Sequence, residues 1–213
     1  MLIAVEGLRH GYGAAPVVDL PSWSVPEGRH CLVLGPSGSG KTTLFNILAG
    51  LIRPERGRVT VAGQAIAELA PDALDRFRGR TVGIVFQTLH LVKALSVADN
   101  LRLARYLAGL APDDGRILGV LAALGLADKA RRRPRDLSQG EAQRVAIARA
   151  VINGPKLILA DEPTSALDDA SCARVVDLLT EQARDCGATL VIATHDARVR
   201  DRFDLRLDMG GRS

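Results

Sequence analysis

Residues 35–42 decide the fold, and they read Gly35-Pro36-Ser37-Gly38-Ser39-Gly40-Lys41-Thr42. They match G-x-x-x-x-G-K-[ST], a loop that wraps nucleotide phosphates. The apolar run 31–34 precedes the loop and a helical pattern begins at Lys41, which is the strand–loop–helix context that the motif requires. An accidental glycine-rich turn would need no such flanks. The pattern therefore predicts a site for a nucleoside triphosphate.

The residue types in this loop suit phosphate chemistry. Glycine adopts backbone angles that turn N–H groups inward and leaves room for phosphate oxygens, and the following helix adds its positive end. Lys41 is expected to reach the β- and γ-phosphates, and the Thr42 hydroxyl is expected to ligate Mg²⁺. We count the whole loop together with the next residue, Thr43, as nucleotide-binding.

The composition is that of an ordinary globular protein. The 213 residues suffice for one compact domain with a subdomain, and 47% are hydrophobic and 24% charged. No apolar stretch approaches the ~18–20 residues that cross a bilayer. The start of the chain lacks the basic-then-apolar layout of a signal peptide. We therefore expect a cytoplasmic chain that reaches a membrane only through a partner.

The cysteine spacing and the net charge give little information about function. Cys31, Cys172 and Cys186 show neither metal-ligand nor disulfide spacing, so reduced thiols are expected. The net charge is +4, and the only basic run is Arg131-Arg132-Arg133. A solvated face explains that run better than contact with anionic lipid or nucleic acid.

Four apolar segments are typical of buried parallel strands, namely 31–34, 82–86, 157–160 and 190–193. The helical patterns between them predict an α/β fold with a mostly parallel sheet and crossover helices. Segments 2–5 and 59–61 lie among turn signals and predict short antiparallel strands near the N-terminus.

Residues 89–153 carry no strand pattern and predict an inserted helical subdomain. Ser96 and Asp99 resemble a capping box that opens one helix. Pro112-Asp113-Asp114 is expected to open a second helix, which runs to about residue 124 and ends at Gly125. The remaining core comprises residues 1–88 and 154–213, so the whole chain, 1–213, is predicted to be one domain.

Two carboxylates, Asp161 and Glu162, end the third apolar segment. The carboxyl edge of a parallel sheet is where ligands bind, so both side chains are expected there. Asp161 is suited to hold Mg²⁺, and Glu162 is suited to accept a proton from an attacking water. Because Pro163 follows, Glu162 alone could instead be a helix cap, but the phosphate loop in the same chain favours catalysis.

The stretch Leu137-Ser138-Gln139-Gly140-Glu141 precedes an amphipathic helical pattern. Ser138 and Glu141 fit a capping box, which is a structural role. The same residues would also present a hydroxyl and backbone N–H groups to a γ-phosphate at a helix N-terminus.

With these motifs in this order, the chain resembles the nucleotide-binding subunit of an ATP-binding cassette (ABC) transporter over nearly its whole length. The resemblance implies a P-loop NTPase (RecA-like) core with an N-terminal antiparallel β subdomain, and ATP with Mg²⁺ as cofactors. The family signature LSGGQ stands here as LSQGE, with Gln139 in place of the first signature glycine and Glu141 in place of the final glutamine. In the family, this signature closes over ATP held by a second subunit, so a homodimer is implied.

Further residues match family motifs in chain order. Gln87 matches the glutamine that senses Mg²⁺ and the attacking water, and His195 matches the switch histidine at the γ-phosphate. Asp168 belongs to the stretch Ser165-Ala166-Leu167-Asp168, which resembles the loop that links the two composite sites. Tyr12 matches the aromatic residue that stacks on adenine, although a single tyrosine in a turn is easily a packing residue instead.

The resemblance also implies a membrane permease that contacts the region after Gln87, and a peripheral position on the cytoplasmic face of the inner membrane. Residues 88–95 are apolar for a loop, which suits a partner surface or burial against the helices. The branch resembled is that of lipoprotein-release and macrolide-export ATPases. A regulatory ATPase of the cell-division type remains the alternative, and no nucleic-acid partner is expected.

Overall fold

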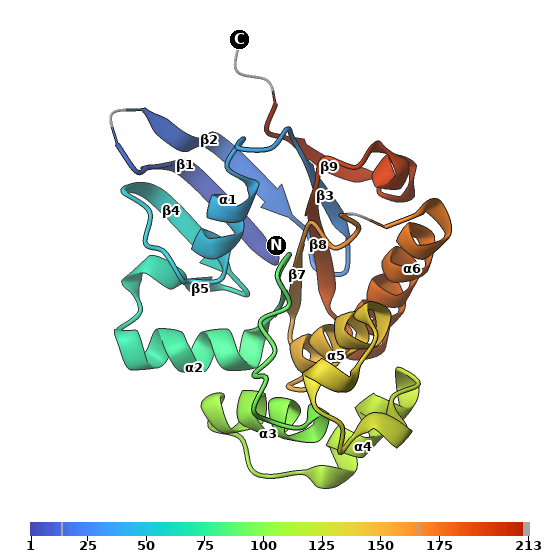
Figure 1. Ribbon diagram of the computed structural model, residues 1–213. Helices are drawn as coiled ribbons and strands as arrows, with labels where there is room; N and C mark the ends of the chain where they lie inside the picture. The colour runs from blue at the N-terminus through green and yellow to red at the C-terminus, as the bar shows by residue number, and fades with distance from the viewer. Residues whose placement is uncertain (14, 166, 211–213) are drawn as a thin grey trace.

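Two β-sheets form the body of the computed structural model, which describes residues 1–13, 15–165 and 167–210. Figure 1 shows the parallel sheet beside the antiparallel one, with a group of helices at its other flank. The described residues thus give the α/β fold with a parallel sheet that the apolar segments predict.

The parallel sheet has the strand order β6-β7-β8-β3-β9. Its strands are β3 (Cys31–Leu34), β6 (Val82–Val85), β7 (Leu157–Asp161), β8 (Thr189–Thr194) and β9 (Leu205–Asp208). All four predicted strands are confirmed, with ends that differ by one residue at most. The sequence does not predict β9, because this edge strand exposes alternate residues and lacks a continuous apolar run.

The antiparallel sheet has the order β2-β1-β4-β5, from β1 (Ile3–Gly11), β2 (Pro16–Val25), β4 (Arg56–Val61) and β5 (Gln64–Ala65). The predicted antiparallel pairing is confirmed by Val5 opposite Val59. The prediction missed β2, whose sequence contains Pro21. Proline cannot donate to a ladder and is tolerated here because β2 lies at the sheet edge.

Helices cover the parallel sheet and fill the segment between β6 and β7. They are α1 (Lys41–Leu48), α2 (Pro71–Thr81), α3 (Val97–Leu107), α4 (Asp114–Ala123), α5 (Gln139–Val151) and α6 (Asp169–Cys186), with short 3₁₀ turns at Ile66–Glu68, Ala127–Lys129, Pro134–Asp136 and Ala197–Arg202. As predicted, Ser96 caps α3 and accepts a hydrogen bond from the Asp99 N–H at 3.1 Å. Asp113 caps α4 in the same way.

The two faces of the parallel sheet bury different side chains. Leu32, Ile158 and Ile192 pack against the helical side, whereas Val33, Leu159 and Val191 pack against α1 and the antiparallel sheet. Alternate residues of each strand enter opposite cores, as a sheet covered on both faces requires. Within the described residues, no helix is both long and apolar enough to cross a membrane.

Strand register brings the predicted site residues to one edge. Leu34 lies opposite Thr194, and Asp161 lies opposite Ala193. The phosphate loop, the Asp161–Glu162 pair and His195 therefore all leave the sheet at its carboxyl edge, where α/β proteins bind ligands.

Candidate functional site

A pocket of about 250 Å³ opens at this edge. Its lining joins the phosphate loop and the start of α1 to residues from four other segments of the chain. The lining residues are Val17, Ser37, Gly38, Gly40, Lys41, Thr42, Thr43, Gln87, Glu162 and His195. The structure thus brings together all four residues predicted to be catalytic. It also places Gln87 beside the loop, with its side chain exposed.

The N-terminus of α1 is open to an anion. The helix has no acidic residue in its first turn and no side-chain cap. Gly40 precedes it with φ of 94°, and a Cβ there would lie 2.5 Å from the Val17 carbonyl oxygen. Only glycine fits this position, so the loop can turn its N–H groups toward a phosphate.

The Lys41 ammonium is already held over the loop. Its Nζ donates to the carbonyl oxygens of Gly35 at 2.7 Å and Pro36 at 3.0 Å, and it lies 3.2 Å from Glu162 Oε1. The side chain is only 6% exposed. A buried charge needs such partners, and incoming phosphate oxygens would offer stronger ones.

Thr42 and Asp161 form a pair suited to a divalent cation. The Thr42 hydroxyl donates to Asp161 Oδ2 at 2.7 Å, while Asp161 Oδ1 is buried without a hydrogen-bond partner among the described residues. Burial raises the pKa of Asp161, and the hydrogen bond from Thr42 offsets part of that rise. Hydroxyl and carboxylate oxygens are the ligands that Mg²⁺ prefers, so these residues fit it.

Glu162 is held in a strained conformation that directs it into the pocket. Its φ is +47°, in the left-handed region that non-glycine residues rarely adopt. Two hydrogen bonds of its main chain stabilise the turn, from Glu162 N–H to Ala193 O at 2.8 Å and from Ser165 N–H to Glu162 O at 3.2 Å. Such strain persists where the surrounding structure fixes it, often at functional sites.

The Glu162 carboxylate is surrounded by hydrogen-bond partners. His195 Nδ1 lies 3.0 Å from both oxygens, and the Thr194 hydroxyl donates to Oε2 at 2.9 Å. Burial alone would raise the pKa of Glu162, but the hydrogen bonds from His195, Thr194 and Lys41 lower it below its ordinary value. The group is therefore a carboxylate at neutral pH.

Sequence reasoning missed one polar group here. Thr194, directly before His195, donates a hydrogen bond to Glu162, and its position at the end of a buried strand could have indicated a role. Ser39, which the loop motif does predict to bind nucleotide, has a buried hydroxyl without a partner among the described residues, and this suits a phosphate oxygen.

Tyr12 lies beside the start of α1 and is 68% exposed. Its hydroxyl is 3.5 Å from Thr43 Oγ1, and the His10 ring meets it edge-on at 5.2 Å. An exposed ring of this kind leaves a face free to stack on a base.

The signature residues lie elsewhere. Ser138 caps α5 and accepts from the Glu141 N–H at 3.2 Å, while Glu141 Oε2 accepts from the Ser138 N–H at 2.8 Å, so the capping box is confirmed. A second pocket, of about 550 Å³, is lined by Gln139, Gly140 and Asp168 among other residues. None of the signature residues lines the first pocket. Of the loop that ends at Asp168, Ala166 lies outside the described residues.

A parallel sheet, a phosphate loop that opens a helix, and paired carboxylates at the sheet edge define a P-loop NTPase. The family model for ABC transporters matches residues 18–165, and the chain belongs to this family. It is an ABC ATPase subunit, as its resemblance predicts.

Known relatives cover most of this chain. The lipoprotein-releasing system ATP-binding protein LolD of Anaeromyxobacter dehalogenans is 44% identical over 212 residues, which covers 95% of this chain and 87% of LolD. The macrolide export ATP-binding/permease protein MacB of Hyphomonas neptunium is 39% identical over 94% of this chain, but only 32% of MacB is covered. The chain therefore spans about a third of the length of that MacB relative.

A solved structure supports the fold. A dimeric, post-hydrolysis state of an ATP-binding cassette bound to ADP and phosphate superposes with a TM-score of 0.86 at 31% identity. The match covers 97% of this chain and 93% of that one.

Proposed function

We propose that the chain is the ATP-hydrolysing motor subunit of a membrane exporter of the lipoprotein-release or macrolide-export type. The observation that carries this proposal is the single pocket shared by Lys41, Thr42, Gln87, Glu162 and His195 at an open helix N-terminus. The similarity to LolD and MacB supports the branch.

ATP would bind with its phosphates over the α1 N-terminus and its adenine against Tyr12. Lys41 would leave the Gly35 and Pro36 carbonyl oxygens for the β- and γ-phosphates. That movement would also release Glu162 from its ion pair with Lys41, leaving the carboxylate free to accept a proton from the attacking water. Gln87 would orient this water, and His195 would contact the γ-phosphate while fixing Glu162.

Thr42 and Asp161, together with Gln87, would hold Mg²⁺. When bound, the cation supplies positive charge that neutralises the β- and γ-phosphate oxygens. The unpartnered Asp161 Oδ1 supports this assignment, because a buried carboxylate oxygen without a donor is otherwise costly.

Asp161→Asn tests the cation site. Asparagine keeps an oxygen for the Thr42 hydroxyl but removes the charge, so we expect the Mg²⁺ concentration for half-maximal ATP turnover to rise about 10–100-fold. Binding of a fluorescent ATP analogue in EDTA should change by less than about twofold, because Asp161 would contact phosphate only through the cation. An unchanged Mg²⁺ dependence would remove Asp161 from the site.

A second copy of the chain would complete the site. Ser138, Gln139, Gly140 and Glu141 lie outside the first pocket, which supports a role at a γ-phosphate bound by another molecule. Ser138 and Gly140 would then provide the hydroxyl and backbone N–H groups, and Asp168 would lie near the seam. The dimeric cassette among the solved relatives supports this pairing.

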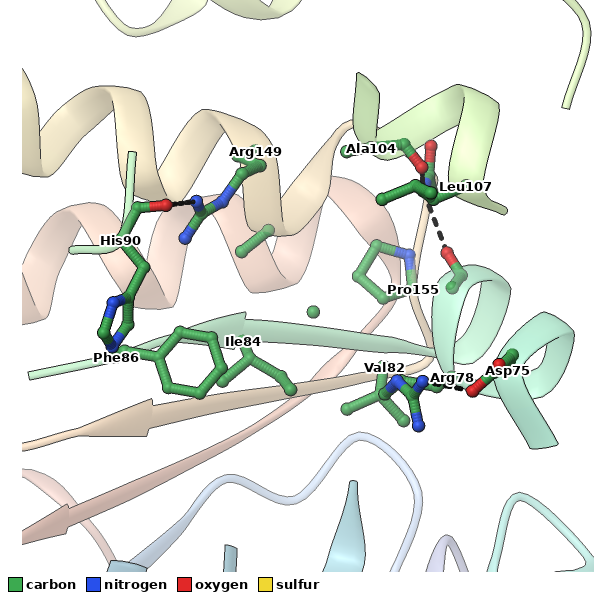
Figure 2. Close-up of a pocket in the computed structure, with 14 residues that line it drawn as sticks. Asp75, Arg78, Val82, Ile84, Phe86, His90, Ala104, Leu107, Arg149 and Pro155 are labelled. Carbon is green, nitrogen blue, oxygen red and sulfur yellow. Dashed lines mark hydrogen bonds and ion pairs between the residues drawn. The ribbon is translucent and has the colours of Figure 1, made fainter. Parts of the chain in front are cut away.

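The permease would dock in a cleft of about 360 Å³ between α2, β6, α3 and α5. Figure 2 shows Arg149 reaching the carbonyl oxygen of His90, with Phe86 and Leu107 also in the lining. Arg149 donates to His90 O at 2.6 Å and Leu89 O at 2.8 Å. These bonds tie the segment after Gln87 to the helix that starts at the signature, so a partner in this cleft would contact both.

Leu107 supports a partner in this cleft, because it lines the cleft with 66% of its surface exposed. We propose that the partner places the chain at the cytoplasmic face of the inner membrane. Within this arrangement residues 89–153 form the helical subdomain, and the rest of the chain forms the core.

Leu107→Asp tests the docking cleft. A buried charge at the interface should weaken binding about tenfold or more, measured as the fraction of chain that sediments with inner-membrane vesicles of the source cells. Leu118→Asp is the matched control, since Leu118 is 52% exposed on the neighbouring helix α4 and does not line the cleft. Equal retention of both variants on vesicles would argue against this docking site.

A further inference from the structure

Arg198 joins two loops that border the site. It lies in the 3₁₀ turn Ala197–Arg202, three residues after His195. Its Nε and Nη2 donate to the two oxygens of Asp196 at 2.9 and 2.8 Å, which is a bidentate pair. The Arg198 N–H adds a third bond to the same carboxylate at 3.0 Å.

The same guanidinium reaches the segment around Asp168. Nη2 donates to the Leu167 carbonyl oxygen at 3.2 Å, and Nη1 donates to Asp169 Oδ1 at 2.5 Å. These two residues flank Asp168, which caps α6. One side chain therefore holds both neighbours of the residue predicted to lie at the dimer seam.

Residues of two other segments hold the Asp196 carboxylate in place. Its Oδ2 accepts from the Thr164 hydroxyl at 3.0 Å and from the Cys172 thiol at 3.7 Å, and the side chain is only 11% exposed. The hydrogen bonds from Arg198 keep the pKa of Asp196 well below its ordinary range, so the carboxylate stays charged. The Arg198 contact with Asp196 is thus made to a fixed anion.

This arrangement continues to the hydrolytic carboxylate. The Asp196 N–H donates to Thr194 Oγ1 at 3.0 Å, and the Thr194 hydroxyl donates to Glu162 Oε2 at 2.9 Å. A connected set of hydrogen bonds therefore runs from Glu162 through the loop after β8 to the Leu167 carbonyl oxygen.

An ordinary surface ion pair is the competing explanation. It accounts for the contact between Arg198 and Asp169. The Asp169 side chain is 90% exposed, so this ion pair contributes little to the free energy of folding. It does not account for a bidentate pair to the half-buried Asp196 carboxylate together with a hydrogen bond to a main-chain carbonyl of another loop, since three donors of one planar group are then used at once.

We propose that Arg198 is a positioning residue that fixes the Asp168 segment to the loop carrying His195, so that dimer closure and the placement of Glu162 are coupled. This inference rests on the proposed function, because it assumes that the Asp168 segment lies at the seam between two copies. Coupling of this kind requires one structural element whose conformation responds both to dimer closure and to the position of Glu162. The two loops that Arg198 joins provide this element.

Arg198→Gln removes the bridge without touching the nucleotide pocket. We expect the turnover number to fall about fivefold to tenfold, while KM for ATP stays within about twofold. In a Glu162→Gln background, ATP-dependent dimerisation measured by analytical ultracentrifugation should weaken by a similar factor. Arg202→Gln is the matched control, because it makes the same change in the same turn and removes only the ion pair with Asp177.

Arg198→Lys separates bridging from charge. A single ammonium cannot bond Asp196 and the Leu167 carbonyl as a planar group does, so this variant should resemble Arg198→Gln. Full activity of Arg198→Lys, or behaviour of Arg198→Gln equal to that of Arg202→Gln in both assays, would overturn the bridging role. If the Glu162→Gln parent does not dimerise with ATP, the proposed function itself fails, and the two failures are distinguishable.

Discussion

Replacing Glu162 with glutamine should stop steady ATP turnover while ATP remains bound. The proposed base would then carry no negative charge, so it could not accept the proton of the attacking water, and we expect a loss of at least about 100-fold. ATP affinity should not fall, because glutamine keeps the shape of the side chain and Lys41 loses a competing ion pair. The expected product is a stable, ATP-bound dimer, seen by size-exclusion chromatography with retained nucleotide.

The matched control for this variant is Glu181→Gln on α6. Glu181 is exposed, so the same chemical change there should leave both turnover and oligomeric state unaltered. Hydrolysis by Glu162→Gln at the rate of the Glu181→Gln control would exclude Glu162 as the base. A variant that neither hydrolyses nor binds ATP would instead indicate that Glu162 is needed to hold Lys41.

The sequence predicted which residues meet in the phosphate pocket because its motifs are local. The phosphate loop and the Asp161–Glu162 pair each lie at the end of an apolar strand, and strand ends of a parallel sheet meet at one edge. Thr42 contacting Asp161 at 2.7 Å follows from that rule, although the two residues lie far apart in the sequence.

The contacts and strands that the sequence did not predict depend on how strands align with one another and on which strands lie at a sheet edge. The contact of Thr194 with Glu162 requires the alignment of β7 with β8, which no single segment encodes. The Arg198 bridge likewise requires two loops that approach only in the folded chain. The strand β2 was missed because Pro21 argues against a strand until its edge position is known.

The signature poses a different problem. Its local structure, a capping box at Ser138, was predicted and is confirmed. Its proposed partner is the phosphate pocket of another copy, because the signature residues are absent from the lining of that pocket in their own chain. An experiment that combines copies is therefore needed to test whether the signature and the phosphate pocket act together.

Mixing two inactive variants should restore turnover if each site is shared between copies. Lys41→Ala removes the ammonium from the phosphate loop, and Ser138→Arg blocks the signature, so each alone should lose about 100-fold or more. In a mixed dimer, the intact phosphate loop of one chain meets the intact signature of the other. Random pairing should then recover about a quarter of the wild-type rate, because half of the dimers carry one complete site of two.

The decisive control places both substitutions in one chain. Mixing this double variant with Lys41→Ala supplies no intact phosphate loop, so no recovery is expected, whereas the two single variants should recover at equal total concentration. Recovery should also fall on dilution, because the complete site exists only in the dimer. Full activity of Ser138→Arg by itself would show that hydrolysis does not need the signature of a second copy, and would refute the shared site proposed above.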